Sequence, residues 1–181
     1  VAGYLSLPLI LILACYSYMK RLTVFTHWYL GACLGLAPLA AVIALDGTVS
    51  LSLILLCLSI TFWTAGFDII YALQDLHFDR DNQIKSIPAK LGVKKSILIS
   101  KICFLFMTMA LLTIGYLQNK GFIYYMGVFI IGVFLSYEHR LIRSFEFEDN
   151  GKKINKAFFT MNAYVSVVYL IFLQFDIWVN K

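Results

Sequence analysis

Six long apolar runs that contain no Asp, Glu, Lys or Arg dominate this sequence. They are residues 1–19, 22–45, 47–67, 102–119, 121–137 and 157–175. Each run approaches or exceeds the roughly 20 mostly apolar residues that a helix needs to cross a bilayer. Open sheets are excluded in lipid because their unpaired backbone groups cost several kcal/mol each, and the alternating strands of a membrane barrel are not visible. The runs therefore predict an all-α, multi-pass membrane protein with six transmembrane helices.

The composition supports this class and excludes several others. Apolar residues make up 61% of the chain and charged residues 14%, against about 45–50% and about 25% in a soluble domain. Disordered, collagen-like and disulfide-scaffold proteins are thereby excluded. The four cysteines all lie in apolar runs and form no C-x-x-C pair, so we interpret them as small apolar core residues rather than metal ligands.

The breaks between the runs carry a strong charge asymmetry. If the runs cross the membrane alternately, 13 of the 15 Lys and Arg residues fall on one side, which includes two longer loops at about 75–101 and 138–156. Cytoplasmic loops are enriched in Lys and Arg, so this side is predicted to be cytoplasmic. The net charge of +5 is therefore a topology signal, and we expect no nucleic-acid partner.

Three aspartates follow one another at helical spacing where the third run ends. Asp68 and Asp75 are seven residues apart, Asp79 follows four residues later, and Tyr71 lies between them. This spacing predicts one stripe on a helix at the cytoplasmic membrane face. A carboxylate within a span is a functional-site hypothesis by default. Mg²⁺ typically binds one or two carboxylates together with substrate phosphates and water, so the stripe is a candidate magnesium site.

Basic residues are predicted to lie on the same side as these acids. Lys20 and Arg21 close the first run, and Lys85 follows the aspartates by a few residues. Lys and Arg bind phosphates readily, Arg through its planar fork and Lys as a point charge. Carboxylates, cations and aromatic residues at one membrane face suggest a Mg²⁺-bound phosphate ester whose apolar tail lies among the helices.

Other interpretations of the same residues remain open. The acids can form a solvated helix end, and the basic residues can be ordinary flanks of cytoplasmic helix ends. A transporter or channel that uses Asp68 as an ion site is a second hypothesis. We interpret His27, His77 and His139 as surface or interface residues rather than ligands. Asn162, in the last run, is expected to form a helix–helix hydrogen bond.

Three segments of the sequence, in this order, carry a specific resemblance. They are Tyr16-Ser-Tyr18-Met-Lys20-Arg21-Leu-Thr23, then Asp68-x-x-Tyr71-Ala-x-Gln-Asp75-x-x-x-Asp79 followed by Lys85-Ser86, and finally Phe158-Phe-Thr-Met-Asn162-Ala-Tyr-Val-Ser166. Together they resemble the intramembrane aromatic prenyltransferases of the UbiA superfamily. The second segment, with Ser86–Gly92 and Tyr137–Leu141, is most similar to the 4-hydroxybenzoate polyprenyltransferase branch. Many members of that branch are thought to serve the futalosine route to menaquinone.

The resemblance also implies what the chain lacks. The family has nine helices and a first aspartate motif, Asn-Asp-x-x-Asp, but the only aspartate before Asp68 is Asp46, on the opposite side. We therefore expect residues 1–181 to be the C-terminal two-thirds of one transmembrane domain, without its first three helices and inactive by itself. At Gln83 the family usually has Gly, so the turn there is expected to differ.

The resemblance implies a reaction and a role for each candidate residue. Asp68, Asp75 and Asp79 would hold Mg²⁺ on a polyprenyl diphosphate, and Lys20, Arg21 and Lys85 would neutralise the leaving diphosphate. The rings of Tyr71 or Tyr18 would stabilise the allylic cation. Apart from the resemblance, Asn162 is a further candidate for binding the aromatic acceptor. That acceptor would be 4-hydroxybenzoate or a dihydroxynaphthoate. The expected location is the bacterial cytoplasmic membrane, with the active-site loops on the cytoplasmic side.

Overall fold

The computed structural model describes residues 2–45, 47–142, 160 and 162–180. Throughout these residues the chain forms helices, turns and short connections without any strand, which confirms the predicted all-α fold. The chain divides into two compact units, Val1–Ala110 and Leu111–Lys181. Each unit is described by itself.

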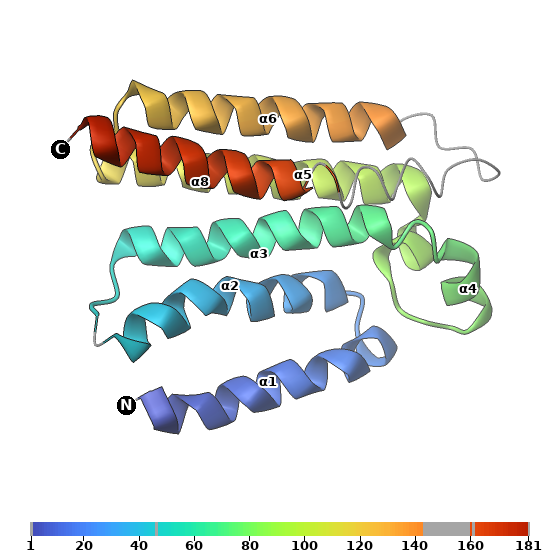
Figure 1. Ribbon diagram of the computed structural model, residues 1–181. Coiled ribbons are helices and arrows are strands. Elements are labelled where there is room, and N and C mark those ends of the chain that lie inside the picture. Colours follow the sequence, from blue (N-terminus) through green and yellow to red (C-terminus); the bar gives the residue numbers. More distant parts are fainter. Residues whose placement is uncertain (1, 46, 143–159, 161, 181) are drawn as a thin grey trace. The chain divides into compact units, whose positions relative to one another are not determined.

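Seven helices occur in the described part of the chain (Figure 1). They are α1 (Ala2–Leu22), α2 (Thr26–Ala44), α3 (Leu51–Tyr71), α4 (Leu76–Asp81), α5 (Ile87–Leu117), α6 (Phe122–Ile142) and α8 (Asn162–Val179). Five of them, α2, α3, α5, α6 and α8, are long and apolar enough to cross a membrane, and α1 contains a shorter apolar stretch, Ser6–Tyr16. Residues 157–159 and 161 of the sixth predicted span lie outside the described residues.

The prediction of a long loop at residues 75–101 is wrong, because most of this segment is helical. It contains α4 and the first half of α5. The Ser86 hydroxyl accepts a hydrogen bond from the Ala89 N–H (3.3 Å), which is a typical N-terminal cap. The prediction relied on runs free of charged residues, which identify membrane spans. Such runs miss helices that carry exposed lysines, such as Lys94 and Lys101 of α5. The helix is interrupted once, at Gly92, where φ is 76° and ψ is 172°.

Two glycines of α2 allow the backbones of α2 and α3 to approach closely. A Cβ atom at Gly31 would overlap the carbonyl oxygen of Thr61 on α3, and one at Gly35 would overlap the Thr61 hydroxyl and the Cys57 carbonyl oxygen. Small residues four positions apart are a common device for packing membrane helices, because lipid provides no hydrophobic force between them. The Gly31–Gly35 pair therefore fixes the contact between these two helices.

A third close approach joins α3 to α5. Gly66 lies against the ring of Phe104, and the Ser100 hydroxyl donates to the Gly66 carbonyl oxygen (2.8 Å). Next to this contact, Ala65 and Ile69 form a buried cluster with residues of α5. These contacts hold the C-terminal half of α3, which carries Asp68, against α5.

In the second unit, Asp176 of α8 satisfies the N-terminus of α6. Its carboxylate accepts hydrogen bonds from the N–H groups of Gly121 (3.2 Å) and Tyr124 (3.3 Å) and from the Asn180 side chain (3.2 Å). The side chain is 1% exposed. The first N–H groups of a helix have no partner within that helix, and a negative charge at this end is favourable. Asp176 therefore fastens α8 to the beginning of α6.

Replacing Asp176 by alanine is expected to lower the free energy of unfolding by about 2 kcal/mol. The change leaves buried N–H donors without acceptors, and each such donor costs about 1–3 kcal/mol. Asp176→Asn keeps an acceptor oxygen and should lose less. Thermal unfolding in detergent measures both variants, and Asn180→Ala, which removes only one donor, is the matched control. Equal stability of Asp176→Ala and Asn180→Ala would contradict this role.

Candidate active site

The candidate residues of the first unit gather where several helix ends meet. Figure 1 shows the α1–α2 connection, the end of α3, α4 and the beginning of α5 at one end of this unit. Two hydrogen bonds fasten the loop before α5 to the end of α1. The Lys85 N–H donates to the Lys20 carbonyl oxygen (2.8 Å), and the Lys85 ammonium donates to the Leu22 carbonyl oxygen (3.1 Å).

The prediction that Asp68, Asp75 and Asp79 form one stripe on a single helix is wrong. Helix α3 ends at Tyr71, and the chain turns before α4 begins at Leu76. In the turn the N–H groups of Leu73, Gln74 and Asp75 bond the carbonyl oxygens three residues before them, which is a tighter winding than in an α-helix. The turn buries Ala72, Leu73 and Leu76. The spacing that would align Asp68 with Asp75 and Asp79 is therefore lost.

The three aspartates consequently have different surroundings. The Asp68 side chain is 13% exposed and contacts His27. Asp75 is exposed at the beginning of α4, while Asp79 is 4% exposed. Among the described residues, Oδ2 of Asp79 has no hydrogen-bond partner. No group of three or more acidic, histidine or cysteine side chains is placed to share a metal ion within the described ranges.

Asp79 lines a cleft of about 330 Å³ together with several cationic residues. Arg80, Lys85 and Lys90 line the same cleft, and the Arg80 guanidinium also donates through Nε to the Ala89 carbonyl oxygen (3.3 Å). A cleft with one buried carboxylate and three cations suits an anionic ligand, alone or with a divalent cation. Asp79 and Lys85, two of the candidate residues, thus line the same cleft.

The remaining predicted residues are not among those that line this cleft. Arg21 and Tyr18 are exposed near the end of α1, and Lys20 is half-buried there. Tyr71 is half-buried as the last residue of α3. Asn162 is the first residue of α8, in the second unit. The roles assigned to these residues remain predictions.

The expected difference of the turn at Gln83 is wrong, because the backbone keeps a positive φ there. Gln83 has a φ of 54°, a left-handed conformation in which glycine is favoured. The turn between α4 and α5 therefore keeps the conformation that glycine prefers, although glutamine occupies it. Gln83 also lines the cleft that contains Asp79.

Sequence reasoning missed His27. It was interpreted as a surface or interface residue, but its side chain is fully buried. Nδ1 lies 2.7 Å from Oδ2 of Asp68, and Nε2 accepts a hydrogen bond from the Ile87 N–H (3.4 Å). The available signal was its place inside an apolar run, where an ionisable side chain usually has a partner.

Comparison with known proteins identifies the family. The model of the UbiA prenyltransferase family matches residues 1–164. The chain belongs to this family. Among curated proteins, this UbiA-family chain is 32% identical over 162 residues to the 4-hydroxybenzoate octaprenyltransferase of Nitrosococcus oceani, covering 88% of this chain and 54% of that protein. It is 27% identical over 175 residues to the enzyme of the same name from Serratia proteamaculans, covering 97% of this chain and 58% of the relative.

Two solved structures share the fold. The apo structure of a UbiA homologue from Aeropyrum pernix K1 matches with a TM-score of 0.79 at 24% identity, over 96% of this chain and 63% of that chain. A digeranylgeranylglyceryl phosphate synthase matches with a TM-score of 0.74 at 18% identity, over 96% of this chain and 60% of the other. This UbiA-family chain thus spans about half the length of the curated relatives it matches.

Proposed function

We propose that the protein transfers a polyprenyl group from a polyprenyl diphosphate to an aromatic acid, either 4-hydroxybenzoate or a dihydroxynaphthoate, with Mg²⁺. The observation that carries this proposal is the cleft in which the buried Asp79 faces the same space as Lys85 and Lys90. Family membership and the names of the relatives favour this function over the transporter hypothesis. The cytoplasmic membrane, with the cleft on the cytoplasmic side, is the location that the Lys and Arg asymmetry favours.

The donor set at the cleft fits a magnesium ion bound with a phosphate ester. Asp79 presents a buried carboxylate oxygen without a protein partner among the described residues. Asp75 lies one helical turn before it, and the two are joined by a backbone hydrogen bond of 2.7 Å. Mg²⁺ usually takes only one or two carboxylates and completes its shell with phosphate oxygens and water. Asp79 and Asp75 would hold the ion. Asp68 is a separate candidate ligand, because no group of three such side chains is placed to share one ion within the described residues.

The chain's own residues would supply charge, position and protection from water. Bound Mg²⁺ would act as a Lewis acid and a template for the diphosphate. The Lys85 ammonium group has N–H donors besides the one that bonds the Leu22 carbonyl oxygen. Together with Lys20 and Arg21, it would neutralise the charge on the departing diphosphate. The ring of Tyr71 or Tyr18 would stabilise the allylic cation. Apolar helices would exclude water, which otherwise converts that cation to an alcohol.

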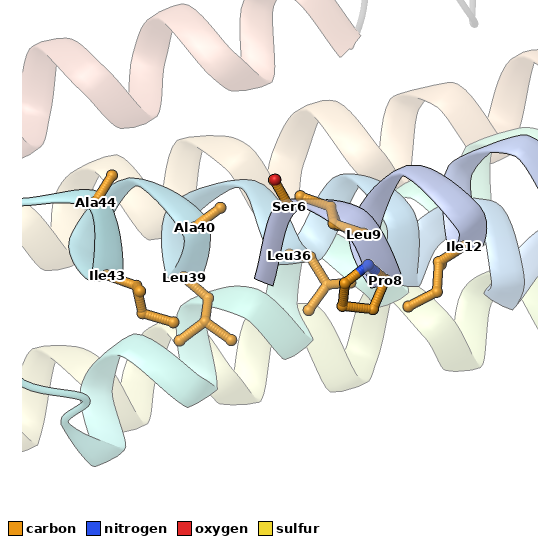
Figure 2. Close-up of a pocket in the computed structure, with 9 residues that line it drawn as sticks. All are labelled: Ser6, Pro8, Leu9, Ile12, Leu36, Leu39, Ala40, Ile43 and Ala44. Carbon is orange, nitrogen blue, oxygen red and sulfur yellow. The ribbon is translucent and has the colours of Figure 1, made fainter. Parts of the chain in front are cut away.

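An apolar cavity in the same unit suits the hydrocarbon part of such a substrate. Its volume is about 380 Å³, and Figure 2 shows side chains of α1 and α2 around it. Leu9, Ile12, Leu36 and Leu39 are among its lining residues. Ile12 precedes Lys20 by eight residues, or about 12 Å along a helix. A cleft with charged lining residues and an apolar cavity in one unit support an amphipathic substrate.

The decisive assay uses the protein encoded by the whole gene, in detergent or liposomes. It is incubated with a polyprenyl diphosphate, Mg²⁺ and either of the two aromatic acids, and the prenylated acid is measured by mass spectrometry. We expect product with one acceptor, loss of product when a chelator removes the metal, and recovery when Mg²⁺ is restored. Absence of product with both acceptors, from folded protein, would refute the proposed reaction.

A further inference from the structure

We infer that His27 is a positioning residue that sets the orientation of the Asp68 carboxylate for cation binding. The inference rests on the proposed function, because it deepens the role of an acid in the proposed site. It is carried by two contacts that His27 makes at once, one to Asp68 on α3 and one to Ile87 at the beginning of α5. All three residues belong to the first unit.

The two contacts assign the proton on the imidazole ring. The Ile87 N–H can only donate, so Nε2 of His27 must offer its lone pair. In a neutral imidazole the proton then resides on Nδ1. Nδ1–H therefore donates to Oδ2 of Asp68 across 2.7 Å, a distance typical of a hydrogen bond to an ionised acceptor.

The hydrogen bond from the Ile87 N–H fixes the orientation of the His27 ring, because that N–H belongs to the backbone at the beginning of α5. At the beginning of α5, the Ala89 N–H bonds the Ser86 hydroxyl (3.3 Å), and the Lys90 N–H bonds the Ser86 carbonyl oxygen (3.1 Å). Pro88 has no N–H. The Ile87 N–H is thus the remaining donor of this first turn, and His27 accepts it. A helix end usually leaves such donors unsatisfied, so the ring position follows from the backbone of α5.

An anchored ring in turn restricts Asp68. His27 is fully buried, and the Asp68 side chain is 13% exposed. The hydrogen bond occupies Oδ2 and limits rotation of the carboxylate, so it also sets the direction of the other oxygen. Hydrogen bonds to ligating carboxylates orient them, and loss of such a partner typically costs about 10–100-fold in metal affinity or activity. His27 thus acts on the site through Asp68, without itself being a ligand.

Two isosteric substitutions separate the two contacts of His27. The side-chain amide of Asn can occupy the position of Nδ1 and donate to Asp68, whereas that of Gln can occupy the position of Nε2 and accept from Ile87. A role in orienting Asp68 predicts that His27→Asn preserves metal binding and His27→Gln weakens it. A purely structural role at the beginning of α5 predicts no such preference for Asn.

The test measures Mn²⁺ affinity of the whole protein without substrate, by electron paramagnetic resonance, for the parent, His27→Asn and His27→Gln. We expect affinity within about threefold of the parent for Asn and a loss of about 10–100-fold for Gln. In an Asp68→Asn background, His27→Gln should have no further effect, because the coupled partner is gone. Equal losses for Asn and Gln, or a parent that binds no Mn²⁺, would overturn the positioning role.

The outcome also separates this inference from the proposed function. Prenyl transfer by the parent combined with equal Mn²⁺ affinity in all three proteins rejects the role of His27 alone. The expected ranking of affinities without any prenyl transfer rejects the proposed reaction and retains the positioning role. If His27→Gln does not yield folded protein, His27→Asn decides: because it keeps the donor to Asp68, weakened Mn²⁺ binding by folded His27→Asn would overturn the positioning role.

Discussion

Replacing Gly31 by valine is expected to prevent the first unit from folding. The Cβ atom alone would overlap the backbone carbonyl of Thr61 on α3. A flexible side chain can move away from such a clash, but a carbonyl oxygen within a helix can move only if the two helices separate. Overpacking a core usually costs about 1–3 kcal/mol and sometimes more, and this contact with α3 also positions Asp68. We expect a cost above that range.

Size-exclusion chromatography in detergent and thermal unfolding measure the effect of Gly31→Val. Gly35→Val should behave similarly, because the Cys57 carbonyl oxygen would lie 2.5 Å from its Cβ atom. Gly132→Val is the matched control, since nothing lies within 4 Å of a Cβ atom at that position of α6. Folded Gly31→Val protein with the stability of Gly132→Val would show that the close approach of α2 and α3 is not required.

The helical architecture could be predicted because one physical constraint governs it. A backbone in lipid must satisfy its own hydrogen bonds, so runs free of charge indicate helices directly. The same criterion fails at α4 and the first half of α5, where charged residues are exposed on helices. The signal for the contact between α2 and α3 was present in the four-residue spacing of Gly31 and Gly35, which is typical of packed membrane helices.

The candidate site was less predictable, because tertiary contacts decide its geometry. Ala72, Leu73 and Gln74 are ordinary helix formers, so nothing local indicates that α3 ends at Tyr71. Both Ala72 and Leu73 are buried in the turn that follows, and that burial depends on the rest of the fold. The partnership of His27 with Asp68 joins residues 41 positions apart, and single-sequence spacing does not indicate such pairs. The residue types at the site were predictable, whereas their pairing required the fold.

Replacing Asp79 by asparagine is expected to reduce prenyl transfer by the whole protein by at least about 100-fold. The substitution keeps the size of the side chain and removes its negative charge. In the proposed reaction that charge holds Mg²⁺ in a cleft whose lining also includes the cations Arg80, Lys85 and Lys90. Removing one preorganised electrostatic group from an active site typically costs about 10²–10³ in kcat. Turnover at saturating diphosphate and Mg²⁺ measures the effect.

The thermal stability of Asp79→Asn should not fall with its activity, which separates a functional role of Asp79 from a structural one. Oδ2 of Asp79 is buried without a hydrogen-bond partner among the described residues, and burying an unpaired charge is costly. Asp79→Asn should therefore unfold at the same temperature as the parent or higher. Asp81→Asn, an exposed residue two positions further, makes the same charge change and should retain activity. Equal losses of activity in both variants would indicate a nonspecific effect of charge, because only Asp79 lines the cleft.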